Sequence, residues 1–348
     1  MKIRNISGLF DEQNVLEKLT QLGDPLVLIK EHIDFGIYKE LLNKFFNRDE
    51  EAKSGRGRPG YDVITMLQIL FVQRLYNLSD EQIEFQINDR LSFRRFLNIA
   101  FSDAVPDCKT VWAFKETLKV ENYTEDIFNT FLEQLAGKNL IAKEGKMLDA
   151  TIVSVPIQRN SRADNEEIKT GITPQSFIGQ PNKLRQKDTE ARWTKKHNKN
   201  YFGYKNHVKA DVKNKFILNY KITDASVHDS QVCVDLLNKE DRSEPFYADS
   251  AYQTPAIKEK LADLKMPDKI VEKGYRNNPL TEDQNASNKT ISKTRVRVEH
   301  IFGFMYNSMN NGMFVRTIGK KRATLIIGLN NWVYNICRYT QLKKLGIA

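Results

Sequence analysis

Three acidic residues stand far apart in the sequence, each in surroundings that are unusual for a carboxylate. Asp149 interrupts the apolar run KMLDATIVSVPI, and Asp249 ends the short run PFYAD. Glu299 lies in RVRVEHIFGFM, on the helix face that also carries Phe302. A buried carboxylate without a cationic partner is unfavourable by several kcal/mol. For any one of these acids, a helix cap, an ion pair or a surface position explains the residue as well as a metal role does.

Taken together, the three carboxylates have the composition of a metal site. Mg²⁺ prefers hard oxygen ligands and takes a few carboxylates plus water and substrate phosphate. Two such ions about 3.5–4 Å apart activate a water or a 3′-hydroxyl and stabilise the leaving oxygen of a phosphodiester. The three acids therefore predict a centre for phosphoryl transfer that holds two Mg²⁺ ions, for which Mn²⁺ can substitute.

The segments around these acids predict a mixed sheet flanked by helices, an α/β fold. Residues 146–157 are apolar on both faces, which is typical of a central buried strand. Residues 201–212 and 215–225 are expected to form a hairpin that turns at Lys213-Asn214-Lys215. In chain order there follow a helix over 229–237 capped by Asp229, a strand that delivers Asp249, a helix over 255–264, a strand in DKIVEK and a helix over 294–307.

The preceding region, from Gly23 to Leu135, has apolar residues at helical spacing. One helix is expected after the turn-like GRGRPGYD, a second at Ser79 with Gln82 completing a capping box, and a third near Asp107. These short helices are interrupted by DRLSFRRF, which contains Arg90, Arg94 and Arg95. The region is either a helix-turn-helix unit that contacts DNA or a helical bundle that only packs or dimerises.

The charge of the chain indicates a polyanionic partner. Lys and Arg number 54 against 44 Asp and Glu, for a net charge of +10. Residues 183–221 contain twelve Lys or Arg against three acids, interleaved with aromatic residues, a composition that suits phosphates and stacked bases. The DNA-binding residues predicted in this tract are Arg192, Trp193, Lys195, Lys196, Lys199 and Lys205.

Other features of the sequence limit the classes of protein to which the chain can belong. The polar stretch from Gln158 to Glu190 is expected to be a surface loop. No apolar run is long enough to span a bilayer, and MKIRNISGLFDEQN turns acidic before any apolar stretch, unlike a secretory signal. Three scattered cysteines, Cys108, Cys233 and Cys337, favour a reducing compartment and argue against structural zinc. We expect a cytoplasmic, nucleoid-associated bacterial protein with no membrane partner.

Seven strings occur in the order found in a known family. GRPGYDVITMLQILFVQRLYNLSDEQIEFQINDRLSFRRFLNI, VPDCKTVWAFKETL, MLDAT, YFGYKNHVKAD, ASVHDSQ, YADSAY and RVRVEHIFG resemble segments of the DDE transposases of bacterial insertion sequences. The similarity runs over most of the chain. It is greatest to group five, within the broader group-four-like superfamily.

The resemblance implies a ribonuclease-H-like fold in which Asp149, Asp249 and Glu299 are the catalytic, metal-binding triad. The family signature around the glutamate has Tyr, Arg, Glu and Lys at fixed spacing, and Arg295 and Glu299 match it. Ser292 stands at the Tyr position and Tyr306 at the Lys position. The missing Lys puts a contact to the transposon end in doubt, and Lys289, Lys293 or Arg297 are the possible replacements. Residues 286–322 contain eight basic residues and only one acid, which favours DNA contact by Arg295 and Arg297 as well.

We therefore expect a helical region for DNA binding and dimerisation (1–140) and a ribonuclease-H-like catalytic domain (141–348). The expected reaction is metal-dependent cleavage at terminal inverted repeats and strand transfer into double-stranded target DNA, by a homodimer or higher assembly. Two alternatives remain open at this level: a nuclease that cuts without joining, and a transposase-derived DNA-binding protein.

Overall fold

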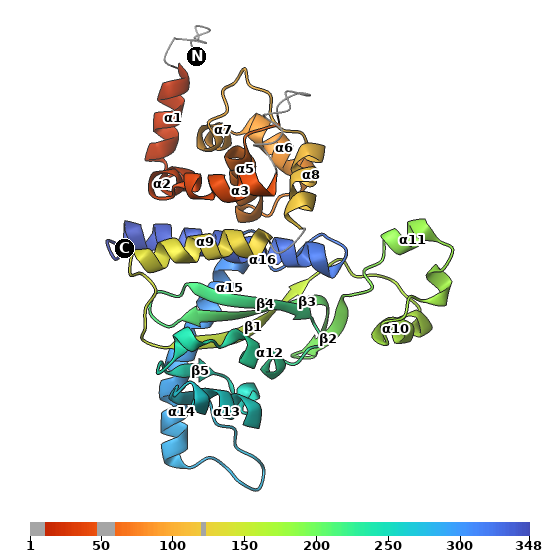
Figure 1. Ribbon diagram of the computed structural model, residues 1–348, viewed down its shortest axis with the longest axis vertical. Coiled ribbons are helices and arrows are strands. Elements are labelled where there is room, and N and C mark those ends of the chain that lie inside the picture. Colours follow the sequence, from red (N-terminus) through yellow and green to blue (C-terminus); the bar gives the residue numbers. More distant parts are fainter. Residues whose placement is uncertain (1–10, 47–59, 120–122) are drawn as a thin grey trace, which may run out of the picture. The chain divides into compact units, whose positions relative to one another are not determined.

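The computed structural model describes residues 11–46, 60–119 and 123–348 (Figure 1). The chain forms two compact units: Met1–Val120 with Ile336–Ala348, and Glu121–Asn335. The division falls within the long helix α16 (Lys320–Lys344), so the last residues of this helix belong to the first unit. The predicted domain boundary near residue 140 stays a prediction.

The first unit is helical in the part that the structure describes. Its α-helices are α1 (Asp11–Gln21), α2 (Pro25–His32), α3 (Lys39–Phe45), α5 (Val63–Leu75), α6 (Asp80–Asp89), α7 (Leu91–Leu97) and α8 (Cys108–Leu118), with a short 3₁₀ turn, η1 (Phe35–Tyr38). The buried rings of Phe35, Phe71 and Phe96 meet in its core, with centroids less than 6 Å apart. The N-terminal segment MKIRNISGLF and residues 55–59 of GRGRPGYD lie outside the described residues.

Local sequence signals set the ends of two of these helices as predicted. Ser79 caps α6, and a capping box with Gln82 is present. Asp107 caps α8 by accepting a hydrogen bond from the Thr110 amide, 2.7 Å away. These signals are confirmed because each depends on groups no more than three residues apart.

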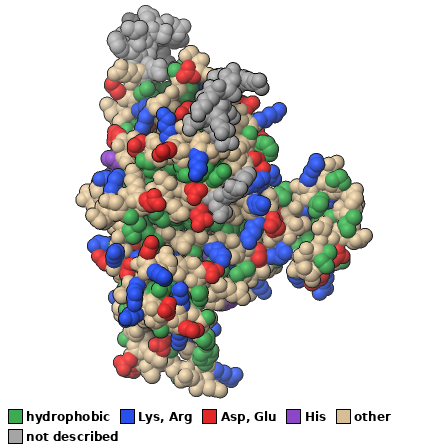
Figure 2. All heavy atoms as spheres, in the orientation of Figure 1, with side chains coloured by type: hydrophobic (Ala, Val, Ile, Leu, Met, Phe, Trp, Pro, Cys, Tyr) green, Lys and Arg blue, Asp and Glu red, His purple; other side chains and the backbone are tan. Residues whose placement is uncertain are grey.

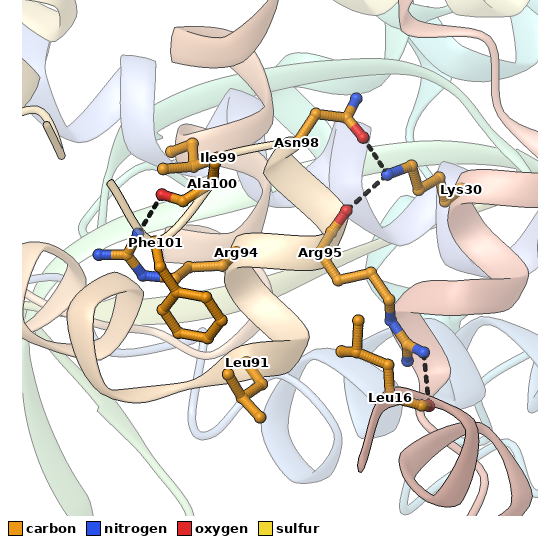
Figure 3. A pocket seen from close by; sticks show the side chains of 9 residues that line it. All are labelled: Leu16, Lys30, Leu91, Arg94, Arg95, Asn98, Ile99, Ala100 and Phe101. Carbon is orange, nitrogen blue, oxygen red and sulfur yellow. Dashed lines mark hydrogen bonds between the residues drawn. The ribbon is translucent and has the colours of Figure 1, made fainter. Parts of the chain in front are cut away.

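The segment LSFRRFL was predicted to interrupt the helices. It forms a helix of its own, α7, so this prediction is wrong. Arg94 and Arg95 are engaged within the unit, as Figure 3 shows for a pocket beside α7. Arg94 donates to the Ala100 carbonyl (2.6 Å), and Arg95 donates to the Leu16 carbonyl (2.8 Å) and pairs with Asp24 (2.5 Å). Both guanidinium groups therefore serve internal packing in this structure.

The second unit contains a mixed six-stranded sheet. The strands are β1 (Lys146–Ser154), β2 (Arg192–Lys196), β3 (Lys199–Asp211), β4 (Ile217–Asp224), β5 (Phe246–Ala248) and β6 (Asp268–Ile270). Their order is β2-β3-β1-β5-β6, and β4 also pairs with β3. β1 is central as predicted, antiparallel to β3 and parallel to β5. The expected β3–β4 hairpin is confirmed, and Lys215 in its turn has a φ of 63°.

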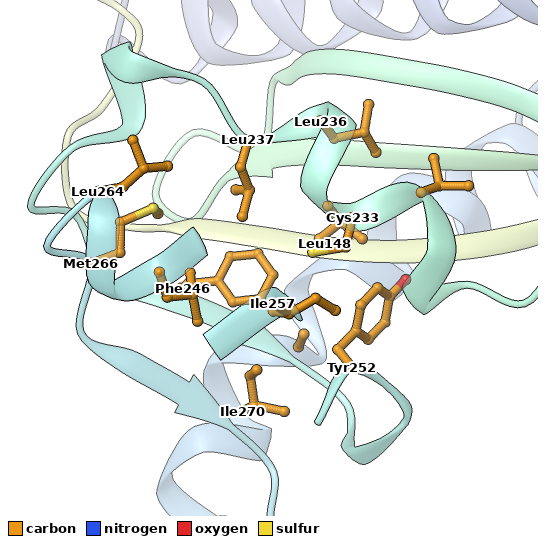
Figure 4. Packing of buried hydrophobic residues seen from close by; sticks show 13 residues of the cluster. Leu148, Cys233, Leu236, Leu237, Phe246, Tyr252, Ile257, Leu264, Met266 and Ile270 are labelled. Carbon is orange, nitrogen blue, oxygen red and sulfur yellow. The ribbon is translucent and has the colours of Figure 1, made fainter. Parts of the chain in front are cut away.

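Helices cover both faces of this sheet. On one face, α12 (Ser230–Leu236) and α13 (Pro255–Asp263) pack against Leu148 and β5 in the apolar cluster of Figure 4. On the other face, α16 is joined to β3 by a buried hydrogen bond between Asn206 and Asn331 (2.8 Å). α9 (Tyr123–Gly137) also belongs to this unit, and the ring of its Phe128 meets Tyr220 of β4 edge to face.

Between β1 and β4 one prediction is wrong, and one strand was not predicted. The stretch from Gln158 to Glu190 is not a loop, because it forms α10 (Arg162–Lys169), the 3₁₀ turn η2 (Gln175–Phe177) and α11 (Pro181–Arg185). It buries Ile168 and Phe177, which gives the polar segment a small core of its own. The basic residues 192–196, expected only as a DNA-binding tract, form the edge strand β2.

The C-terminal part of the unit is more helical than predicted. The helix expected over 294–307 is α15 (Arg297–Asn307), and a further helix, α14 (Glu282–Arg295), precedes it. Two short 3₁₀ turns, η3 (Lys239–Asp241) and η4 (Ser250–Tyr252), flank β5. No helix in the described ranges is long and apolar enough to cross a membrane.

Candidate active site

Asp149 lies in β1 and Asp249 directly follows the neighbouring strand β5. β1 and β5 run parallel, with Lys146 opposite Phe246 and Met147 opposite Tyr247. Paired residues of the two strands differ by 100 in number, as Asp149 and Asp249 do. Both strands therefore lead their aspartates to the same end of the sheet. Asp249 directly follows β5 and accepts a hydrogen bond from the Ala251 amide (2.8 Å), which begins η4. The structure thus brings together two acids that are distant in sequence.

The environment of Asp149 disfavours its ionised form. The pKa of Asp149 is raised to about 6, mainly by burial and also by the negative charge of Asp249. A hydrogen bond from the Ala150 amide and the positive charges of Arg295 and Lys196 act in the opposite direction. A cation placed between the two aspartates would relieve both unfavourable effects.

Glu299 is joined to this pair through Arg295. The Nη2 atom of Arg295, at the end of α14, donates to Glu299 Oε1 at 3.2 Å. Its Nη1 atom lies 3.6 Å from Asp149 Oδ2. Glu299 is more exposed than predicted, with 56% of its side-chain surface accessible. In this structure the guanidinium therefore lies between two of the three acids.

The three acids do not form a closed metal cage in this arrangement. Among residues 11–46, 60–119 and 123–348, no three His, Cys, Asp or Glu side chains are close enough together to hold an ion. The donor chemistry nevertheless fits a hard divalent cation, since two carboxylates are adjacent and a third is one guanidinium away. Glu299 would have to exchange its Arg295 contact for the ion.

Tyr252 is a feature of the site that sequence reasoning missed. Its side chain is fully buried and its hydroxyl has no hydrogen-bond partner. Burial raises the pKa of Tyr252 well above its usual range, and the charges of Asp149, Asp229 and Asp249 add to this effect. A buried hydroxyl without a partner, under the influence of these three aspartates, fits a site that takes up water or a hydrated ion. The string YADSAY contains this residue, but nothing in the string shows where its hydroxyl lies.

The predicted DNA-binding residues fall into two groups. Three are held by internal contacts: Arg192 donates to the Ile168 carbonyl (2.8 Å), Lys205 pairs with Asp229 (2.8 Å), and Arg297 donates to the Val212 carbonyl (3.0 Å). Six others are exposed, namely Lys195, Lys196 and Lys199 around the β2–β3 turn, Trp193 on β2, and Lys289 and Lys293 on α14.

Asp229 does not act as the predicted helix cap. It occupies the position before α12, but its side chain makes no capping hydrogen bond and pairs with Lys205 instead. Lys205 also donates to the Val227 carbonyl at 2.7 Å, so one ammonium group ties the start of α12 to β3. A charge-assisted pair with a partly buried lysine replaces the weaker bond to a backbone amide.

Two family models match the chain over these units. One, described as a transposase DDE domain, matches residues 143–336, and the other, described as a transposase domain (DUF772), matches residues 14–117. No solved structure matches the chain. Membership of group five within the insertion-sequence transposases stays a prediction. The first match covers more than half of the sequence and includes the whole mixed sheet, whose architecture is ribonuclease-H-like. The chain therefore belongs to the family of DDE transposases.

Proposed function

We propose that this transposase binds the ends of its own insertion sequence, cleaves them, and joins the cut ends to target DNA. Transposases act on DNA, and the family supports nuclease and strand-transfer chemistry in general. The observation that carries the proposal is that adjacent parallel strands bring Asp149 and Asp249 to the same end of the sheet, with Glu299 linked to Asp149 through Arg295.

In this proposal the three carboxylates are the catalytic residues and the ligands of two Mg²⁺ ions, or of Mn²⁺ in their place. The bound ions supply Lewis acidity, which makes a water or 3′-hydroxyl nucleophilic and stabilises the leaving oxygen. Arg295 offsets part of the negative charge of Asp149 and Glu299 when no ion is bound. Its planar guanidinium also matches the geometry of a phosphate, so the same side chain can hold the scissile strand.

The exposed cations supply the DNA surface. Lys195, Lys196 and Lys199 cluster around one tight turn, with Trp193 next to them, and Lys289 and Lys293 are exposed on the helix that leads to Arg295. Terminal repeats and target duplex are the proposed partners. A homodimer or higher assembly is proposed because two ends must be joined in one reaction.

The test is cleavage of the repeats that flank the gene, in the presence of Mg²⁺. We expect Asp149→Asn, Asp249→Asn and Glu299→Gln each to reduce cutting by at least about a thousandfold, comparable to the loss of a key electrostatic contact in a transition state. DNA binding should be retained. Asp263→Asn, on an exposed position of α13, is the matched control.

Precut ends distinguish the remaining alternatives. Joining of precut ends to a target duplex supports transposition, whereas cutting without joining identifies a nuclease. Binding without either reaction identifies a DNA-binding derivative. If one of the three variants cuts as well as wild type, that residue is not part of the catalytic site.

A further inference from the structure

A groove lies beside the three acids. It encloses about 460 Å³, within the range of small-ligand sites. Its wall along β1 runs from Thr151 to Ser154, beyond the two residues through which β1 pairs with β5. The far end is closed by the segment around Phe314, because the Ser154 amide donates to the Met313 carbonyl (2.9 Å).

The opposite wall of this groove is the same helix face that carries Glu299. Phe302 and Gly303 stand one turn after Glu299 on α15, and Tyr306 stands two turns after it. One turn of helix rises about 5.4 Å, so the groove begins within a few ångströms of the acids. Whatever occupies the groove is therefore next to the reacting phosphate of a bound strand.

The lining of the groove combines aromatic rings with short polar groups. Tyr306 is 59% exposed, and Tyr201 of β3 and Phe302 add further rings. Thr151, Ser154 and Asn311 supply hydroxyl and amide groups, and no acidic side chain lines the groove. Flat rings with a few hydrogen-bonding groups match a nucleobase better than an aliphatic side chain.

Cations flank the groove on two sides. Arg316 is exposed and lies over the ring of Phe314, 5.6 Å from its centroid. Lys199 is exposed two residues before Tyr201, on the same side of β3. This charge is complementary to a phosphodiester that enters and leaves the groove.

We propose that the groove is a subsite for one unpaired nucleobase of the DNA strand next to the cleavage site, stacked on Tyr306. The proposal rests on the proposed function, because it places the base beside the scissile phosphate. It gives Tyr306 a stacking role in holding the strand.

Gly303 provides a way to fill the groove without strain. A Cβ atom added there meets no atom within 4 Å. Leu favours a helix more than Gly does, so Gly303→Leu should fold at least as stably as wild type while its side chain occupies the groove. Gly137, at the end of α9, is equally open and does not line the groove, so Gly137→Leu is the matched control.

The experiment measures binding of a short abasic DNA strand with and without a single purine, by fluorescence anisotropy. Wild type should bind the purine-containing strand at least about fivefold more tightly, the lower end of the effect of base stacking on an aromatic ring. Gly303→Leu and Tyr306→Ala should lose this preference. Tyr306→Phe, which keeps the ring, and Gly137→Leu should retain it.

A preference for the purine that is equal in wild type and Gly303→Leu would overturn the proposal, and so would its absence in wild type. Loss of self-association by Gly303→Leu with an unchanged purine preference would assign the groove to a second copy of the chain, which also overturns it. Cleavage of the flanking repeats by wild type is measured separately. Failure of wild type to cleave would refute the proposed function. The purine preference tests separately whether the groove binds a nucleobase.

Discussion

At the scale of single residues, the distinctive feature is an arginine between two acidic side chains. Arg295 contacts Asp149 and Glu299, and its charge offsets part of the cost of burying Asp149. Its neutralisation of Asp149 is incomplete, because the pKa of Asp149 is still raised to about 6. The site therefore favours additional positive charge.

The raised pKa makes a prediction about stability without divalent ions. Above pH 6 the folded protein carries an ionised, partly buried Asp149, whereas well below pH 4 the residue is protonated in both folded and unfolded states. Asp149→Asn should therefore increase the free energy of unfolding at pH 7.5 by up to about 3 kcal/mol, at 1.36 kcal/mol per pKa unit over about two units. Urea unfolding with a chelator present measures it.

The gain should disappear as the pH falls through 6 to 4. Asp211, whose pKa burial also raises to about 6, is present in both proteins and cancels in the comparison. A variant that is less stable than wild type at pH 7.5, or equally stabilised at pH 4, would contradict the prediction.

At the scale of elements, the β2–β3 hairpin depends on one glycine. Gly203 lies where β3 passes Ser154 of β1 and Arg192 of β2, and its φ is 155°. A Cβ atom there would lie 2.2 Å from the Val153 carbonyl oxygen. The absent side chain lets β1 approach the hairpin that carries Lys195, Lys196 and Lys199.

Gly203→Ala should therefore destabilise the second unit by about 2–3 kcal/mol, since the clash is with backbone and the backbone angle is also unfavourable. Gly137→Ala is the control, because its added methyl group meets open space and should change stability little. Thermal unfolding followed by circular dichroism compares the two. Equal melting temperatures would show that β1 and the hairpin adjust to the methyl group without strain.

At the scale of the whole molecule, the net charge of +10 is dispersed. Figure 2 shows Lys and Arg side chains mixed with acidic ones over the visible face, with no single continuous basic area. Several cations, such as Lys209 with Asp241 and Lys146 with Glu244, are buried in ion pairs. The total of 54 Lys and Arg residues therefore overstates how many cations face a ligand.

The salt dependence of DNA binding measures how many cations contact the phosphates of the DNA. The triple variant Lys195→Gln, Lys196→Gln, Lys199→Gln should reduce the slope of log affinity against log salt by about 3, since each phosphate contact contributes about 0.9. Lys213→Gln with Lys221→Gln is the control, because these lysines pair with Glu144 and Asp235. A slope that is unchanged by the triple variant would place the DNA elsewhere on the protein.

The sequence by itself determined the elements that carry the three acids and the order of these elements. The cap at Ser79, a helix that begins near Asp107, the central strand that carries Asp149, the strand before Asp249 and the helix over 255–264 were all predicted. Each depends on neighbouring residues, through hydrogen bonds three positions apart or an apolar period of two or three to four. The seven ordered strings also indicated the family that the model matches confirm.

Only the tertiary structure decided which charges meet. The contact of Arg295 with Asp149, the pairing of Lys205 with Asp229 and the groove between β1 and α15 join segments that are distant in sequence. The helices within residues 158–190 were missed because two buried side chains, Ile168 and Phe177, stabilise a segment that is otherwise polar. Such contacts depend on strand register and helix packing, where a shift of one residue exchanges the partners and no local pattern records the choice.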